Sequence, residues 1–394
     1  MERGVRLISV EKSRLLRMSE DRQADIHATF EKHRAEPGVT IDEYVRHRRI
    51  ELGKLLDGKR RIYLDKRYWI VIRDVALGRR TDQSSTGLLV QLRRLVSSGT
   101  AFCPVSEVLF IELLKQTDLY TRRETAKVID ELSLGVSLAP EEERVGTELA
   151  HLFHATKNPN SVYPLDWLVW LKVPYAVSMA HPTNTSLAPT EERALQKTFF
   201  DQMWDMTLVE LVDNLGDAEP PSLINCALLA EKLNVGMRTH AQEIRSFKQA
   251  YATEIAGALS VYSERAIEIF TRMEERLTGV MTNNSEAKKR ETAVLLHKML
   301  TNAMRLGKLS QRLPTLHVIA MCHAAYRWDT KRRFEANDIF DFHHASAALG
   351  FCDIFLTEND LRTQLTAGHL MLDKELDCVV LSDTGKAVAH LSSL

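Results

Sequence analysis

The sequence predicts an α/β protein with a parallel sheet whose strands come from both ends of the chain. Two short apolar runs, residues 61–65 and 100–106, are each followed by a helical pattern. Strand and helix in alternation are typical of a parallel sheet, because parallel strands need a crossover connection. Two further apolar runs, residues 353–357 and 378–382, indicate that the same sheet is completed near the C-terminus.

Helical periodicity fills the segments around the first two runs. Residues 41–56 carry apolar side chains at near-helical spacing and follow Thr40, which is a suitable N-terminal cap. Similar spacing predicts helices over residues 86–96, 108–114 and 120–132, the first of them ended by a Ser-Ser-Gly break. A further helix is expected to run from Asn337 to Gly350 before the third apolar run.

The middle of the chain has weak strand signals and several helical periodicities, which favour an inserted helical region. We therefore expect an N-terminal helical segment (1–60), the first part of the sheet domain (61–140), the insertion (141–312) and the second part of the sheet domain (313–394). Helices in the insertion are expected at residues 142–155, 191–212, 222–233, 240–275 and 286–306.

Composition is that of an ordinary soluble globular protein, with 44% hydrophobic and 27% charged residues among 394. No apolar run approaches the roughly 20 residues that cross a bilayer, and the charged N-terminus lacks the apolar core of a signal peptide. We therefore expect a cytoplasmic protein without a membrane partner. The five cysteines are scattered without a CxxC pair, so free thiols are expected rather than disulfides or a zinc site.

The net charge of −1 does not by itself indicate a nucleic-acid-binding protein. Basic clusters nevertheless occur at residues 46–49, 59–61, 79–80, 288–290 and 331–333. Each cluster alone is more often a solvated helix end or loop, but together they permit a basic groove.

Three acidic residues from distant segments are expected to meet at one edge of the sheet. Asp65 ends the first strand, Glu112 lies about two helical turns beyond the second, and Asp341 is expected in the first turn of the helix before the third. Ligands of open parallel sheets bind outside the carboxyl ends of the strands. Carboxylate oxygens suit Mg²⁺ and Mn²⁺, and paired ions of this kind can activate water for phosphodiester cleavage.

Each of these residues also has a purely structural interpretation. Asp65 could be a strand-end turn residue, Glu112 a solvated helix residue, and Asp341 an acid favoured by the helix dipole. Glu107 competes with Glu112, but five residues along a helix correspond to about 140° of rotation, so the two are not expected to share a metal. Asn337 or Asp338 is the expected helix cap.

Two adjacent histidines, His343 and His344, suggest a general base. Neighbouring residues on a helix point about 100° apart, so we expect one imidazole to be packed and the other exposed. A metal-bound water needs no imidazole base, and both residues are expected to be dispensable for the chemistry.

Three segments resemble motifs of PIN-domain nucleases. RIYLDKRYWI (61–70) is similar to their first strand, which ends on an acidic ligand, and PVSEVLFIELLK (104–115) to their second strand and helix. NDIFDFHHASAALGFCDIFLTEND (337–360) is similar to their C-terminal signature, an Ala-rich helix followed by a strand ending in T-x-N/D. The resemblance covers residues 61–120 and 335–385, fewer than half of the chain, and implies a PIN-like sheet.

The resemblance also implies the roles of individual residues. Asp65, Glu112 and Asp341 match metal ligands, while Asn359 matches the fourth acidic position and would orient a metal-bound water. Asp360 is the alternative fourth ligand. The small hydroxyl positions near the family's site match Ser106 and Thr357.

Two features depart from the family. Lys66 and Arg67 place positive charge beside the metals, where the second position is often Asn, and would either bind substrate phosphate or hinder metal binding. The insertion between the second and third motifs is far longer than in compact toxin-type members.

The activity that the resemblance implies is that of a Mg²⁺- or Mn²⁺-dependent nuclease that uses a metal-activated water and leaves a 5′-phosphate and a 3′-hydroxyl. An endoribonuclease is expected before a deoxyribonuclease on family frequency alone, and a toxin or defence role is a further expectation. The alternative is a non-catalytic PIN-like scaffold whose helical regions bind a partner protein or a second copy of the chain.

Overall fold

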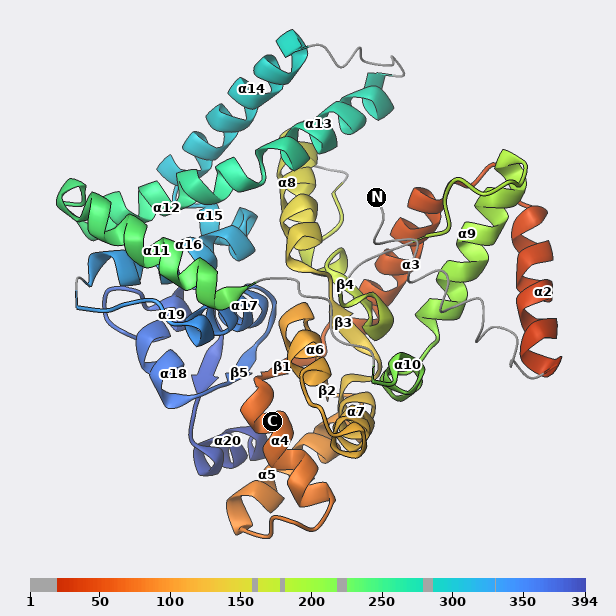
Figure 1. Ribbon diagram of the computed structural model, residues 1–394, viewed down its shortest axis with the longest axis horizontal. Helices are drawn as coiled ribbons and strands as arrows, with labels where there is room; N and C mark the ends of the chain where they lie inside the picture. Colours follow the sequence, from red (N-terminus) through yellow and green to blue (C-terminus); the bar gives the residue numbers. More distant parts are fainter. Residues whose placement is uncertain (1–19, 158–161, 178–180, 218–224, 279–285, 330) are drawn as a thin grey trace. The chain divides into compact units, whose positions relative to one another are not determined.

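The computed structural model describes residues 20–157, 162–177, 181–217, 225–278, 286–329 and 331–394 (Figure 1). The described residues of 1–51 and 179–206 form one compact unit, and those of 52–178 and 207–394 form another. The predicted division into four segments, with boundaries at residues 60, 140 and 312, differs from this division into two units and stays a prediction.

The smaller unit is held together by one aspartate on helix α9 (Pro189–Trp204). Asp201 accepts hydrogen bonds from the Tyr44 hydroxyl (2.7 Å) and the Arg48 guanidinium (2.9 Å), and it lies 2.8 Å from His33 Nε2. These partners lie on α2 (Glu20–Arg34) and α3 (Ile41–Leu56). The predicted cap of α3 is confirmed, since the Thr40 hydroxyl accepts from the Glu43 N–H at 3.3 Å.

The larger unit contains a parallel sheet of four strands in the order β2-β1-β5-β6, which confirms a mixed α/β fold in a mostly helical chain. The N-terminal strand pairs directly with a C-terminal one, with Ile62 opposite Ile354 and Leu64 opposite Leu356. The carboxyl ends of β1 and β5 therefore lie side by side. The strands are β1 (Arg60–Leu64), β2 (Ala101–Phe102), β5 (Ile354–Leu356) and β6 (Val379–Leu381).

The second predicted strand is much shorter than residues 100–106. Pro104 has no N–H to give to a ladder, and the residues on either side of it bond elsewhere: Cys103 N–H to the Leu132 carbonyl and Val105 N–H to the Val136 carbonyl. A separate antiparallel pair, β3 (Val136–Leu138) with β4 (Trp170–Lys172), was not predicted. Strand β4 lies in the region expected to be helical, and three residues are too few to show a period.

Helices cover both faces of the sheet. Figure 1 shows α4, α5 and α20 near one face and α16 and α17 near the other. The helices expected over residues 86–96, 108–114 and 120–132 are confirmed with slightly wider bounds, whereas the one that starts directly after β1 was not predicted. Their bounds are α4 (Lys66–Ala76), α5 (Gln83–Ser97), α6 (Glu107–Leu114), α7 (Leu119–Ser133), α16 (Pro314–Trp328), α17 (Ala336–Phe351), α18 (Asn359–Leu365), α19 (Leu372–Glu375) and α20 (Thr384–Ser392).

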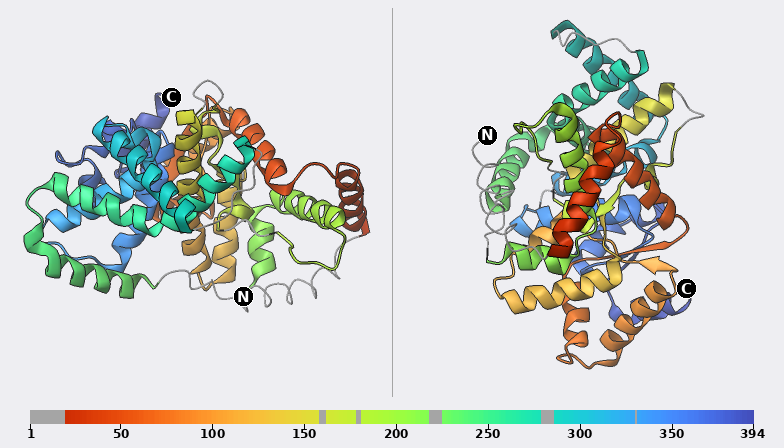
Figure 2. Two further views of the ribbon diagram at one scale, coloured as in Figure 1. Left: turned by 90° about the horizontal axis from the view of Figure 1, so that it is seen from above. Right: turned by 90° about the vertical axis from the view of Figure 1, so that its right-hand side faces the viewer.

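The middle of the chain is helical, as expected, but two of its expected helices are interrupted. The first breaks before Thr207, whose hydroxyl and Glu210 form a capping box that starts a new helix. The second is divided by the segments around Ile244 and Tyr262. A third expected helix, residues 222–233, begins with residues 222–224, which lie outside the described residues. Figure 2 shows the helices α13 and α14 side by side in both views. The bounds are α8 (Glu141–Lys157), η2 (Leu165–Trp167), η3 (Val173–Tyr175), α10 (Leu208–Leu215), α11 (Cys226–His240), η4 (Ala241–Glu243), α12 (Phe247–Val261), α13 (Ser263–Thr278), α14 (Glu286–Arg305) and α15 (Leu309–Arg312).

The start of α17 differs from the prediction. Glu335, not Asn337 or Asp338, is the N-cap, and Asp338 closes a reciprocal capping box with it. The helix begins at Ala336, so Asp341 lies in its second turn rather than its first. The helix dipole acts mainly on the first turn, and it is therefore a weak explanation for Asp341.

A buried carboxyl on α8 makes the stability of the fold depend on pH. Glu148 is fully buried; one of its oxygens accepts the Thr315 N–H at 3.0 Å, and the other has no hydrogen-bond partner within the described residues. Burial raises the pKa of Glu148 to about 8. A carboxyl whose pKa is raised in the folded protein stabilises it at low pH, and this contribution is lost as pH rises from about 4.5 towards 8.

We expect Glu148→Gln, which keeps the shape and stays neutral, to stabilise the protein by on the order of 3 kcal/mol at pH 7. The gain should vanish at pH 4, and urea unfolding across this range measures it. The exposed neighbour Glu142→Gln is the matched control. Equal stability of parent and Glu148→Gln at pH 7 would contradict the raised pKa.

Candidate functional site

Asp65 combines a structural role with a site position. It follows β1 and caps α4, accepting the Tyr68 N–H at 3.3 Å. The Thr357 hydroxyl, at the end of β5, hydrogen-bonds to the same carboxyl. Burial raises the pKa of Asp65 to about 6, although His344 and these hydrogen bonds oppose the rise. The strand-end interpretation is thus confirmed.

Asp341 reaches the same end of the sheet from α17. Burial raises its pKa to about 7, and the charges of Asp338, Asp65 and Glu358 raise it further, while His344 opposes them. Asp65 and Asp341 are therefore close enough to repel each other when both are ionised. The two residues are 276 positions apart, counted from 65 to 341, and the fold brings their charges near enough to interact.

Glu112 is buried on α6, but both of its oxygens are engaged. His344 Nε2 lies 2.9 Å from Oε2, and Lys66 Nζ lies 3.6 Å from Oε1. Burial opposes ionisation, yet these two partners hold the pKa of Glu112 below its ordinary value. Glu112 is thus an ionised, already paired carboxylate, and not the solvated helix residue of the alternative interpretation. Lys66 neutralises it directly.

His344 joins several elements in one hydrogen-bonded chain. Its Nδ1 lies 2.7 Å from the Tyr63 hydroxyl, which lies 2.5 Å from the Ser106 hydroxyl. The expectation that one histidine is packed holds for His344, whereas the expectation that the other is exposed is wrong. His343 is largely covered, and its Nδ1 lies 2.5 Å from Glu141 Oε2. Glu141, its carboxylate partner, lies at the start of α8, and the local sequence gave no indication that this helix packs against His343.

Because His344 holds Glu112, its removal should affect the fold. We expect His344→Ala to cost about 1–3 kcal/mol, since it leaves the buried Glu112 with Lys66 alone and removes a partner of the Tyr63 hydroxyl. His344→Gln, whose amide can still donate to Glu112, should recover part of the loss. Urea unfolding measures both variants. An alanine variant as stable as the parent would show that the hydrogen-bonded chain is not a structural element.

Asn359, which matches the fourth acidic position, lies on the surface and not in the buried group around Asp65. Asn359 is the first residue of α18, is exposed, and accepts from Arg362 and Ser382 at 3.4 Å each. Asp360 is exposed beside it. The nearby acid is instead Glu358, whose negative charge raises the pKa of both Asp65 and Asp341. Sequence reasoning missed Glu358, although its place directly after Thr357 at the strand end could have indicated it.

The remaining predicted residues lie around this group. Ser106 caps α6 by accepting the Leu109 N–H, at 3.4 Å. Arg67 is exposed, and its guanidinium lies 6.0 Å from the ring centroid of Tyr68. Glu107 accepts the Glu141 N–H at 2.9 Å and so faces a different cluster from Glu112, as the helical rotation predicts.

The donor chemistry of the site fits a hard divalent cation. Asp65, Asp341 and Glu358 offer carboxylate oxygens, and burial is the largest cause of the raised pKa values of the first two. Glu112 could join them only by leaving Lys66. Among the described residues, no three His, Cys, Asp or Glu side chains already form a metal-holding group.

Comparison of the chain with protein-family models, with curated proteins and with solved structures finds no match. Within the described residues, no helix is long and apolar enough to cross a membrane.

Proposed function

We propose that this chain is a Mg²⁺- or Mn²⁺-dependent phosphodiesterase that cleaves nucleic acid, RNA in preference to DNA. The proposal is carried by one observation: Asp65, which is buried directly after β1, and Asp341, which is partly buried on α17, are near enough for their charges to interact, and their pKa values are raised to about 6 and about 7. A pair of this kind, at this edge of a parallel sheet, is suited to bind a divalent cation. The PIN-like resemblance adds the reaction type.

A bound divalent ion would supply an activated water and stabilise the leaving oxygen. Asp65, Asp341 and Glu358 would hold it, and the hydrogen bond from Thr357 to Asp65 would keep that carboxylate oriented. Lys66, half-exposed beside Glu112, offers a positive charge near the reacting phosphate. A cytoplasmic location and a toxin or defence role belong to the same proposal.

The second candidate is a non-catalytic scaffold, and one observation favours it. Glu112 is already neutralised by Lys66 and His344, so one of the three expected ligands is not free in this conformation. A partner protein or a second copy would then bind through the helical regions, where large apolar side chains such as Leu228 and Val261 are exposed.

The two candidates are separated by a cleavage assay. Labelled single-stranded RNA and DNA of one sequence are incubated with the protein in Mn²⁺, in Mg²⁺ and in EDTA. We expect metal-dependent cleavage, faster on RNA, with a 5′-phosphate on the new ends. No cleavage, together with no change of melting temperature on adding Mn²⁺, would overturn the enzyme and leave the scaffold.

A further inference from the structure

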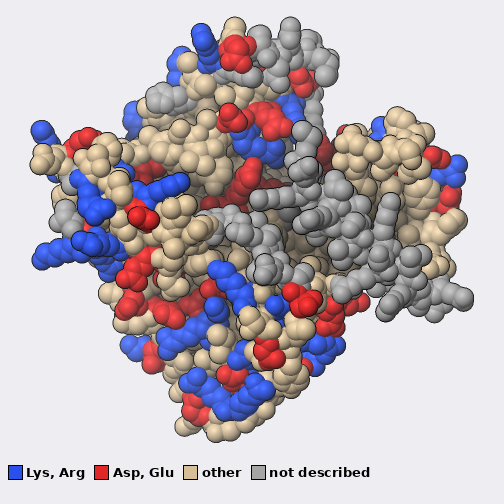
Figure 3. Space-filling model, in the orientation of Figure 1, with Lys and Arg blue, Asp and Glu red and all other residues tan. Residues whose placement is uncertain are grey.

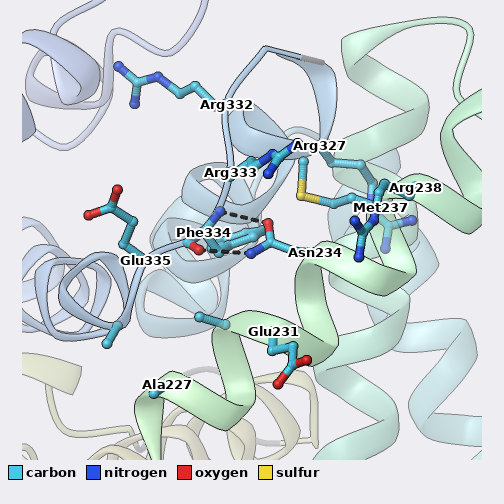
Figure 4. Close-up of a pocket in the computed structure, with 12 residues that line it drawn as sticks. Ala227, Glu231, Asn234, Met237, Arg238, Arg327, Arg332, Arg333, Phe334 and Glu335 are labelled. Carbon is cyan, nitrogen blue, oxygen red and sulfur yellow. Dashed lines mark hydrogen bonds between the residues drawn. The ribbon is translucent and has the colours of Figure 1, made fainter.

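A pocket of about 570 Å³ lies between α11 and the segment that joins α16 to α17 (Figure 4). This volume is within the range of small-molecule sites. Asn234 fixes one wall of the pocket by two hydrogen bonds to the backbone of Phe334, which accepts from Asn234 Nδ2 and donates to its Oδ1, both at 2.8 Å. The position of the joining segment against α11 is thus specified, and with it the shape of the pocket.

Four arginines line this pocket. Two are engaged: Arg327 is paired with Glu254 at 2.6 Å, and Arg332 donates to Gln364 at 2.9 Å. Arg238 and Arg333 are exposed, and neither has a hydrogen bond or ion pair to another described residue. Figure 4 shows both near Arg327, with Arg332 extending away from the group. The two arginines are therefore available to a ligand.

The lining has a charged part and an apolar part. Glu254 neutralises Arg327, and Asp329 lies 3.8 Å from Arg332, so Arg238 and Arg333 are the cations of the lining that have no partner among the described residues. The lining also contains two acids, Glu231 and Glu335. In Figure 3, lysines and arginines also gather at the edge of the molecule where α11 and α12 lie. The apolar part of the lining consists of Ala227, Ala230, Met237, Phe334 and Ala336.

We infer that this pocket binds a nucleotide unit through its phosphate. Guanidinium groups bind phosphate through paired, charge-assisted hydrogen bonds, and Arg238 and Arg333 are the groups free to do so. Met237 and Ala230 offer an apolar surface to a base or ribose. The ligand chemistry is that of a free nucleotide or of one nucleotide in a strand.

The pocket is connected to the carboxylate pair through α17. Ala336, which lines the pocket, is the first residue of this helix, and Asp341 follows five residues later, about 7.5 Å along the axis. Five residues also turn the helix by about 140°, so Ala336 and Asp341 lie on different faces of α17, and a strand held at the carboxylates would have to pass around the helix to reach the arginines. If the ligand is one nucleotide of a strand, the inference rests on the proposed function, and the pocket is a second point of contact for the substrate.

The test measures binding in EDTA, so that it does not depend on cleavage. The probes are adenosine monophosphate, by calorimetry, and a labelled single-stranded RNA of eight nucleotides, by fluorescence anisotropy. We expect Arg238→Ala/Arg333→Ala to weaken binding about tenfold per arginine and to reduce the salt slope of single-stranded RNA binding by about 1.4. Arg93→Ala/Arg123→Ala removes the same charge from exposed arginines elsewhere and should change binding less than threefold.

The possible outcomes are distinct. Binding of the monophosphate that is lost in the pocket variant identifies a free-nucleotide site, and binding of the RNA alone identifies a strand site. No binding of either probe, or equal losses in the pocket and control variants, overturns the inference. A failed cleavage assay with a normal pocket response would reject the nuclease and not the pocket.

Discussion

Asp341→Asn is expected to reduce metal-dependent cleavage about a thousandfold, because a divalent ion supplies several kcal/mol of transition-state stabilisation and this change removes a ligand. The same change should not harm the metal-free fold. The pKa of Asp341 is about 7 in the folded protein, so at pH 8 this carboxyl is mostly ionised, and its ionisation costs stability relative to the unfolded chain. Replacing it with a neutral amide should stabilise the metal-free protein by about 2–4 kcal/mol at that pH.

Metal should have the opposite effect on parent and variant. A hundredfold excess of Mn²⁺ over its Kd stabilises the parent by about 2.7 kcal/mol through mass action, whereas Asp341→Asn should lose most of this gain. Melting with and without Mn²⁺ measures it, and the exposed Asp217→Asn is the control for a lost charge. The site is not a metal centre if the parent shows no response and Arg67→Ala, which removes a nearby cation, does not restore one.

The pH dependence of metal binding should be steep below neutrality. A carboxylate must be deprotonated to bind a metal, and the pKa values of Asp341 and Asp65 are about 7 and about 6. We expect Mn²⁺ affinity to fall up to tenfold between pH 7 and pH 6, and up to about a hundredfold per pH unit below pH 6, where both groups are protonated. Cleavage should follow the same curve.

Without metal, the stability should change in the other direction. Carboxyls with raised pKa values stabilise the fold fully below about pH 3.8, and this contribution is lost as pH rises through about 6 and about 7. The melting temperature in EDTA should therefore fall from pH 5 to pH 8, and adding Mn²⁺ should restore it at pH 8. An Mn²⁺ response that is equal at pH 5.5 and pH 8 would contradict the raised pKa values.

Local sequence predicted the elements that have strong local signals. The apolar runs before Asp65 and before Thr357 are flanked by charge, and both are strands. Short or interrupted elements were missed for physical reasons: β4 has only three residues, and Pro104 ends β2 early. The cap of α17 was misplaced because Glu335 is not a residue that commonly caps helices.

The sequence by itself determined where Asp65 lies, because an acid that directly follows an apolar strand lies at that strand's carboxyl end. Tertiary structure alone decided their charge states. His344 lies 232 positions from Glu112, and their contact leaves that carboxylate ionised and paired. Asp65 is instead buried and Asp341 partly buried, and burial together with the charge of Glu358 raises the pKa of both carboxyls. Burial and pairing depend on long-range packing, which no local pattern of residues encodes.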